Sequence, residues 1–153
     1  MKKRSMTKLI LAVCSVFLAA GMLCTLALAE EDEINIWVEP YMISLNANDE
    51  RKADNEIVVT LGCNLNGMRI TDEDIKFMIS DDDVAVAVSA RVTRTGLVQV
   101  YFDWAEIQEY AINNNLKEEV VVTVSGSYTY EPIGGGDPYG TLTFTGDGVV
   151  FFR

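Results

Sequence analysis

Histidine is missing from this chain of 153 residues. Its imidazole is the most common general base near neutral pH and the most common protein ligand for metals. The absence of histidine excludes catalytic dyads and triads that depend on it, and it argues against a zinc site. No other catalytic motif stands out in the sequence. We therefore expect a protein that is not an enzyme.

Cysteine is scarce, with three residues in the chain. Cys14 and Cys24 lie in an N-terminal apolar segment that we expect to be removed, which leaves Cys63 without a partner for an internal disulfide. The residues before them, Val13 and Leu23, are too large for lipid attachment at either cysteine. We interpret Cys63 as a half-buried, small apolar side chain. The alternative is an intermolecular disulfide in an oxidising compartment.

Basic residues are also few, since 12 Lys and Arg stand against 23 Asp and Glu, a net charge of −11. Residues 1–29 hold four of the basic residues and none of the acidic ones, so residues 30–153 have eight against 23, a net charge of −15. A field of that sign repels nucleic acid and anionic lipid surfaces. We expect neither as a partner.

The N-terminus has the pattern of a secretory signal peptide. Four basic residues within the first eight precede an apolar run over 9–28, and small residues close the run at Ala27 and Ala29. Cleavage after Ala29 would place the protein outside the cell, in the periplasm or on the cell surface. The run is about as long as the roughly 20 residues that span a bilayer, so the alternative is an uncleaved anchor, the one case in which we expect a membrane contact.

The remaining residues, 30–153, are enough for a single domain. Short runs of β-branched and aromatic residues recur between turn signals, a pattern typical of an all-β sandwich. We predict an antiparallel, Ig-like β-sandwich of about seven strands. The expected strands cover 34–38, 42–45, 56–61, 75–79, 84–93, 97–102, 120–130 and 141–152.

Three details of these strands can be predicted. Residues 84–93 have the clearest alternation in the chain, with Val84, Val86 and Val88 expected to face the core. Gly126 indicates a bulge or a close approach of two backbones. The last strand is expected to break near residues 146–148, where two glycines flank an aspartate.

One short helix is predicted over residues 104–113. Asp103 can cap its N-terminus, and Glu106 follows at the spacing of a capping box. Trp104, Ile107 and Ala111 would share one face of this helix. The capping role explains the spacing of the two carboxylates more simply than catalysis by an acid pair would.

The order of these segments resembles a family of small secreted Ig-like β-sandwich modules of bacterial and archaeal exported proteins, sometimes found beside dockerin-type calcium repeats. The residues that carry the resemblance are 38–40, 43–46, 70–75, 100–103, 122–126 and 144–150. The resemblance implies a structural or interaction role and supplies no catalytic residues. This chain departs from the family's usual setting, because a single module directly follows the leader.

Two acidic runs are candidates for a calcium site. Asp81, Asp82 and Asp83 form one run, and Asp72 and Asp74 belong to the other. Calcium prefers clusters of carboxylate and carbonyl oxygens, so a site requires the two runs to meet in space. The alternative is that these aspartates form turns and protect strand edges by their charge.

Three tyrosines near a glycine-rich loop over 132–140 are candidates for ligand binding. Tyr128, Tyr130 and Tyr139 could stack on sugar rings or anchor a protein partner. A sugar platform requires all three rings to be exposed and coplanar. The alternative is that they pack on the strand surface around a flexible connector.

From these patterns we expect an exported, non-enzymatic binding or structural module of the cell envelope or extracellular space. Its expected partner is an extracellular protein or a polysaccharide that the sequence does not identify. Two alternatives stay open: a carbohydrate-binding or weakly carbohydrate-active protein, and a calcium-dependent adhesion module. No cofactor other than calcium is expected.

Overall fold

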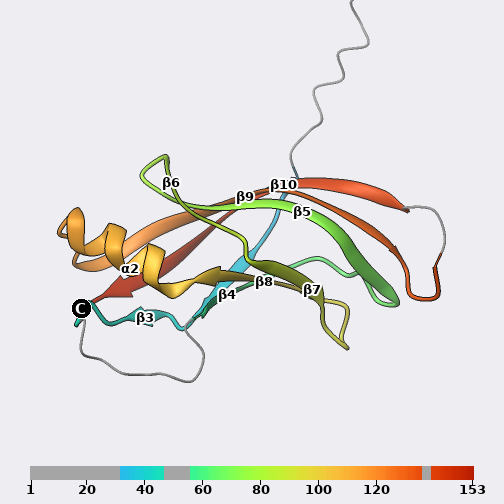
Figure 1. The fold of residues 1–153 in the computed structure, drawn as a ribbon, viewed down its shortest axis with the longest axis horizontal. Helices are drawn as coiled ribbons and strands as arrows, with labels where there is room; N and C mark the ends of the chain where they lie inside the picture. The colour runs from blue at the N-terminus through green and yellow to red at the C-terminus, as the bar shows by residue number, and fades with distance from the viewer. Residues whose placement is uncertain (1–31, 47–55, 136–138) are drawn as a thin grey trace, which may run out of the picture. The chain divides into compact units, whose positions relative to one another are not determined.

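A computed structural model of the protein describes residues 32–46, 56–135 and 139–153 (Figure 1). The predicted signal peptide over 1–29 lies outside the described residues. Among the residues that are described, no helix has the length and apolar character needed to cross a membrane.

The strands form two sheets. The six-stranded sheet has the order β1-β10-β9-β5-β6, with β3 pairing beside β1 on β10, and the four-stranded sheet has the order β2-β4-β8-β7. The strand bounds are β1 Asp32–Glu33, β2 Ile36–Glu39, β3 Met42–Ile43, β4 Glu56–Leu61, β5 Met68–Ile79, β6 Asp82–Val86, β7 Ser89–Val92, β8 Val98–Asp103, β9 Glu118–Pro132 and β10 Gly140–Phe152.

The two sheets pack as a β-sandwich, as predicted. All strand pairs are antiparallel except those of β1 and β3 with β10. Immunoglobulin domains have strands A-B-E-D in one sheet and C-F-G in the other. If β2 is taken as strand A, the four-stranded sheet has the order A-B-E-D, formed by β2-β4-β8-β7. In the other sheet, the neighbouring strands β5-β9-β10 have the order C-F-G. The predicted Ig-like character is therefore confirmed in the strand order.

The core lies between the inner faces of the sheets. Alternate residues of β4, β5 and β8 are buried, as the period-2 pattern predicts. Phe77 of β5 and Phe102 of β8 meet edge to face across the core, with ring centroids 5.4 Å apart. Burying a large apolar side chain of this kind contributes about 1.5–3 kcal/mol.

The predicted helix is present as α2, Trp104–Asn113, between β8 and β9. Asp103 Oδ1 accepts a hydrogen bond of 2.7 Å from the backbone N–H of Ala105, which confirms its role as the N-cap. Ile107 and Ala111 are buried against the core.

The predicted single strand over 84–93 is wrong, because the chain changes sheets within it. Ala87 N–H donates to Ile75 of β5, whereas Val88 N–H donates to Tyr101 of β8. The segment therefore forms β6 in one sheet and β7 in the other. The change also reverses the expected face, so Val86 and Val88 are 58% and 61% exposed while Ala85 is buried.

A similar change of sheets closes the opposite side of the sandwich. We name residues 32–43 the N-terminal strap. Ile34 N–H donates to Thr145 of β10, and Asn35 accepts from Gly62 beside β4, so the strap leaves the six-stranded sheet there. It returns at Tyr41, which accepts from Phe151 of β10.

Glycines permit close packing where backbones cross. The predicted break at 146–148 is wrong, since β10 runs without interruption from Gly140 to Phe152. Gly146 instead makes room for the strap, because a Cβ there would lie 2.5 Å from the Ile34 carbonyl oxygen. The close approach predicted at Gly126 is confirmed, with a hypothetical Cβ 2.1 Å from the Asp74 carbonyl oxygen.

Candidate functional site

The outer face of the four-stranded sheet carries a row of large side chains across all four strands. Trp37 of β2 pairs with Thr60 of β4, Thr60 pairs with Gln99 of β8, and Gln99 pairs with Arg91 of β7. Residues directly opposite each other on antiparallel strands share a face and touch. The adjacent row along the strands consists of Glu39, Val58, Tyr101 and Ser89. We name six of these residues the binding face: Trp37, Val58, Thr60, Arg91, Gln99 and Tyr101.

Three residues of the binding face hold one another in place. The Arg91 guanidinium carbon lies 4.8 Å from the centroid of the Tyr101 ring, a cation–π contact. Gln99 Oε1 accepts hydrogen bonds from the Tyr101 hydroxyl at 3.0 Å and from Arg91 at 3.3 Å. This arrangement orders two long polar side chains before any partner arrives, which lowers the entropy cost of binding.

Trp37 lies at the other end of the row with 54% of its surface exposed. Strand alternation explains why, because its neighbours Ile36 and Val38 occupy the inward positions and are buried. Trp37 and Arg91 are exposed at opposite ends of the row and Tyr101 is half-buried beside Arg91. These three residue types are enriched among those that dominate the binding energy of protein interfaces.

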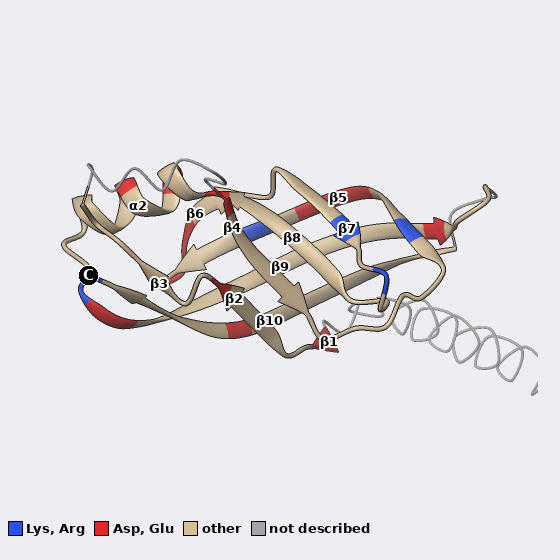
Figure 2. Ribbon diagram, turned by 90° about the horizontal axis from the view of Figure 1, so that it is seen from below, with Lys and Arg blue, Asp and Glu red and all other residues tan. Residues whose placement is uncertain are grey.

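Acidic residues prevail over the domain, and Glu39 of β2 and Glu56 of β4 lie beside the binding face on the same side of the sheet (Figure 2). The part of the face formed by β7 and β8 differs. No Asp or Glu occurs between residues 84 and 102, a stretch that includes β7 and most of β8. In the described part of the chain the ion pairs are Arg69–Glu131 and Lys76–Asp83. Arg91 and the nearby Arg94 belong to neither pair.

The structure corrects the predicted tyrosine platform. Tyr128 is only 1% exposed and belongs to the core, whereas Tyr139 is 69% exposed. Neighbouring rings are tilted, by 56° between Tyr128 and Tyr130 and by 41° between Tyr130 and Tyr139. A sugar ring cannot lie flat across the three. Residues 136–138 of the adjoining loop lie outside the described residues.

Cys63 and Tyr128 form a polar contact inside this aromatic cluster. The Tyr128 hydroxyl lies 3.4 Å from Cys63 Sγ and donates to it. Cys63 is half-buried, as the preferred interpretation of the sequence expects. Burial, followed by the contact with Cys63, raises the pKa of Tyr128 above its ordinary value.

The two acidic runs do not meet. Asp83 pairs with Met78 of β5, about 13 Å along the strand from Asp74 at roughly 3.3 Å per residue. Lys76 lies between them and donates to Asp83, while Asp82 accepts from the Tyr110 hydroxyl at 2.7 Å. The remaining two, Asp72 and Asp81, join no cluster either. Within 32–46, 56–135 and 139–153, no group of three or more carboxylate or thiol side chains is arranged to hold a metal ion.

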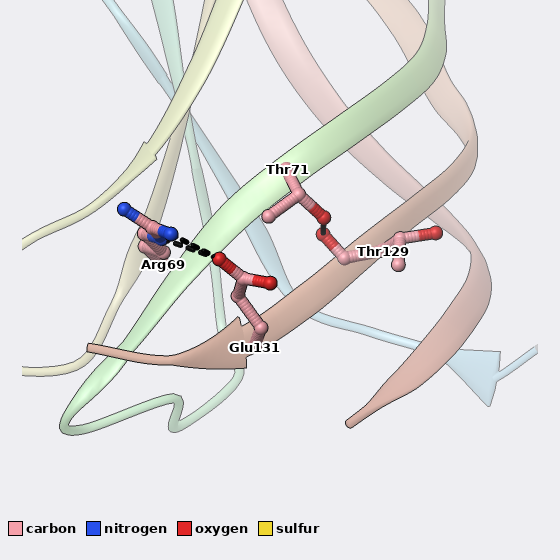
Figure 3. Close-up of polar contacts among 4 residues, drawn as sticks. All are labelled: Arg69, Thr71, Thr129 and Glu131. Carbon is pink, nitrogen blue, oxygen red and sulfur yellow. Dashed lines mark hydrogen bonds and ion pairs between the residues drawn. The ribbon is translucent and has the colours of Figure 1, made fainter. Parts of the chain in front are cut away.

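An ion pair that the sequence does not suggest fastens β5 to β9 (Figure 3). Arg69 donates hydrogen bonds through two nitrogens to Oε1 of Glu131. Glu131 as a residue is 8% exposed. Beside it, the Thr71 hydroxyl donates to the Thr129 carbonyl oxygen at 3.3 Å. These contacts span the register shift between Ile70 and Asp72, so their role is structural.

Sequence reasoning also missed the binding face. Its signal was present, since Trp37 and Tyr101 each stand between two apolar residues in an alternating strand and must face outward. The residues that join it come from four strands, and the order of these strands cannot be read from the pattern.

No model of a known protein family matches the chain, and a search of curated proteins finds no similar one.

Proposed function

We propose that this protein is an exported, non-enzymatic binding module that engages a protein partner through the binding face. The observation that carries the proposal is the exposed Trp37 on the same face as the ordered Arg91, Gln99 and Tyr101. Residues of these types, fixed before binding, are the anchors on which protein interfaces depend.

The same geometry favours a protein over a polysaccharide as the partner. Arg91 lies over the Tyr101 ring, so that ring is not free to stack on a sugar. Trp37 alone offers an uncovered aromatic surface on this face. Carbohydrate binding through Trp37, with Thr60 and Gln99 as hydrogen-bonding neighbours, is the second candidate.

Export rests on the sequence of residues 1–29, with its basic start, apolar run and small-residue end. The resemblance to secreted Ig-like modules agrees with an interaction role in the cell envelope or extracellular space. The strong negative charge supports solubility and disfavours nucleic acid and anionic lipid surfaces as partners.

Capture of partners from the envelope of the source cell by chemical cross-linking and mass spectrometry tests the proposal. The variants are Trp37→Ala and Arg91→Ala, with Tyr139→Ala as the matched control because Tyr139 is also an exposed aromatic residue but lies elsewhere. Loss of an anchor costs about 2 kcal/mol or more, roughly a thirtyfold loss of affinity. We expect one protein to be captured by the wild type and the control and to be lost with Trp37→Ala and Arg91→Ala.

Two results would contradict the proposal. Equal capture by Trp37→Ala and the wild type would remove the binding face from consideration. If the wild type captured a polysaccharide and no protein, and Trp37→Ala lost it, the carbohydrate-binding function would replace the one proposed here.

A further inference from the structure

The sandwich has strand edges on two sides, and they differ in accessibility. The N-terminal strap closes one side by moving from the six-stranded sheet to the four-stranded sheet and back. Residues 82–92 form the other side, with β6 at the edge of one sheet and β7 at the edge of the other. An unpaired edge can accept an additional strand.

Two features protect the edge at β6. Asp82 and Asp83 place negative charge at its start, and the pairing with β5 shifts register between Phe77 and Met78. Charge and irregular pairing are devices that discourage strand addition.

The edge at β7 lacks the acidic charge of β6, and its irregular pairing is confined to its start, where both Val88 and Ser89 lie opposite Tyr101. Its one charged residue, Arg91, directs its guanidinium back over Tyr101 of its own sheet, 4.8 Å from the ring centroid. The positive charge therefore lies over the sheet instead of projecting past the edge. Val88, just before the strand, is 61% exposed.

The main chain of β7 offers hydrogen-bonding groups to the outside. Thr93 N–H donates to the Leu97 carbonyl oxygen at 2.7 Å, which marks a hydrogen-bonded pair with β8. Antiparallel strands alternate between residues whose main chain faces the partner and residues whose main chain faces away. Ser89 and Arg91 therefore face β8, and the N–H and C=O groups of Ala90 and Val92 face the open edge.

The charge around this edge selects for acidic partners. Residues 84–102 contain two arginines and no acidic residue, in a domain whose net charge is strongly negative. Neither arginine belongs to a described ion pair. Arg94, in the turn after β7, therefore offers positive charge at this edge, and Arg91 adds positive charge farther back over Tyr101. Complementary charge at an edge of this kind fixes the partner and speeds its association.

We propose that an extended, acidic segment of the partner protein adds to β7 as a further strand of the four-stranded sheet. Its main chain bonds to Ala90 and Val92, and its carboxylates lie on the face of the sheet that carries Arg91 and toward Arg94. The inference rests on the proposed function, since it names the chemistry of the partner that the binding face would receive.

The test measures the binding of synthetic peptides to the protein without its predicted signal peptide, residues 30–153. One peptide alternates valine and glutamate over eight residues, and its control alternates valine and lysine. Backbone amide NMR monitors Ala90 and Val92, and isothermal titration measures affinity. We expect the acidic peptide to bind and to protect both amides from hydrogen exchange, and the basic peptide to bind at least about tenfold more weakly.

Methylation of alternate peptide nitrogens distinguishes strand addition from simple charge attraction, and it leaves the protein unchanged. We expect the methylated acidic peptide to lose binding. Retained binding after methylation, or no change at Ala90 and Val92 with either unmodified peptide, would overturn the inference. Light scattering that shows a dimer dissociated by the acidic peptide would also overturn it, by assigning β7 to a second copy of this chain.

The outcomes for the two proposals are separable. If the peptides fail while partner capture still depends on Trp37, strand addition is wrong and the binding face remains. If the acidic peptide protects Ala90 and Val92 but partner capture ignores Trp37, the edge is an interaction site and the binding face is not.

Discussion

Tyr128 illustrates how a single side chain can be assigned to the wrong role by its neighbours in sequence. It stands two residues from Tyr130 and near a glycine-rich loop, a setting typical of a binding loop. The inward position on β9 places it instead among core residues, 5.9 Å from Phe144 between ring centroids. Its hydroxyl is satisfied by Cys63, so burial leaves no polar group without a partner.

The buried phenol makes stability depend on pH in the alkaline range. Its pKa is raised in the folded protein, so the unfolded chain loses this proton first as pH rises above about 10. The contribution of Tyr128 is therefore fully present below pH 10 and falls by at most about 1.4 kcal/mol per pH unit above it. We expect urea unfolding to show that the stability advantage of the wild type over Tyr128→Phe shrinks above pH 10.

A constant difference between these two proteins from pH 8 to pH 11 would contradict this prediction. Tyr139→Phe serves as the control, since it also removes one tyrosine hydroxyl but from a ring that is 69% exposed in the folded protein.

At the scale of elements, the sequence predicts strands better than it predicts how they join. The alternation in β4, β8 and β9 identifies their buried faces, and Asp103 marks the start of α2. Between residues 84 and 88, however, valine and alanine alternate, and both can face the core. The chain changes sheets between Ala87, which bonds to β5, and Val88, which bonds to β8. The sequence pattern does not predict this change, so it does not predict which of these residues are buried.

Close crossings of strands depend on glycine in a way that can be measured. Gly126 on β9 has φ +147°, and a Cβ there would lie 2.1 Å from the Asp74 carbonyl oxygen. Gly67 also has a positive φ, +77°, but a Cβ there would meet nothing within 4 Å. We expect Gly67→Ala to cost about 1–2 kcal/mol, the backbone strain alone, and Gly126→Ala to cost more because β5 and β9 must also move apart.

Thermal and urea unfolding of the two variants check this comparison. If Gly126→Ala were no more destabilising than Gly67→Ala, the close contact of β5 and β9 at this position would be wrong.

At the scale of the whole molecule, charge is the main departure from an average domain. With a net charge of −15 over residues 30–153, self-repulsion opposes the compact state. The local ion pairs relieve little of it, because the Lys76–Asp83 pair is exposed and water screens the attraction between its charges. Salt should therefore stabilise the folded protein by screening the repulsion among its many acidic residues. It should not act through any single ion pair.

This reasoning separates general screening from a calcium site. The carboxylates expected to bind calcium are divided between Asp72 and Asp74 on β5 and the run at 81–83, with Lys76 between them. We expect the melting temperature to rise with sodium chloride, to rise equally with calcium and magnesium chloride at matched ionic strength, and not to fall on addition of EDTA at constant ionic strength. A specific rise with calcium that Asp83→Asn abolishes would restore the calcium-dependent adhesion module, because screening alone does not distinguish two divalent ions of equal charge.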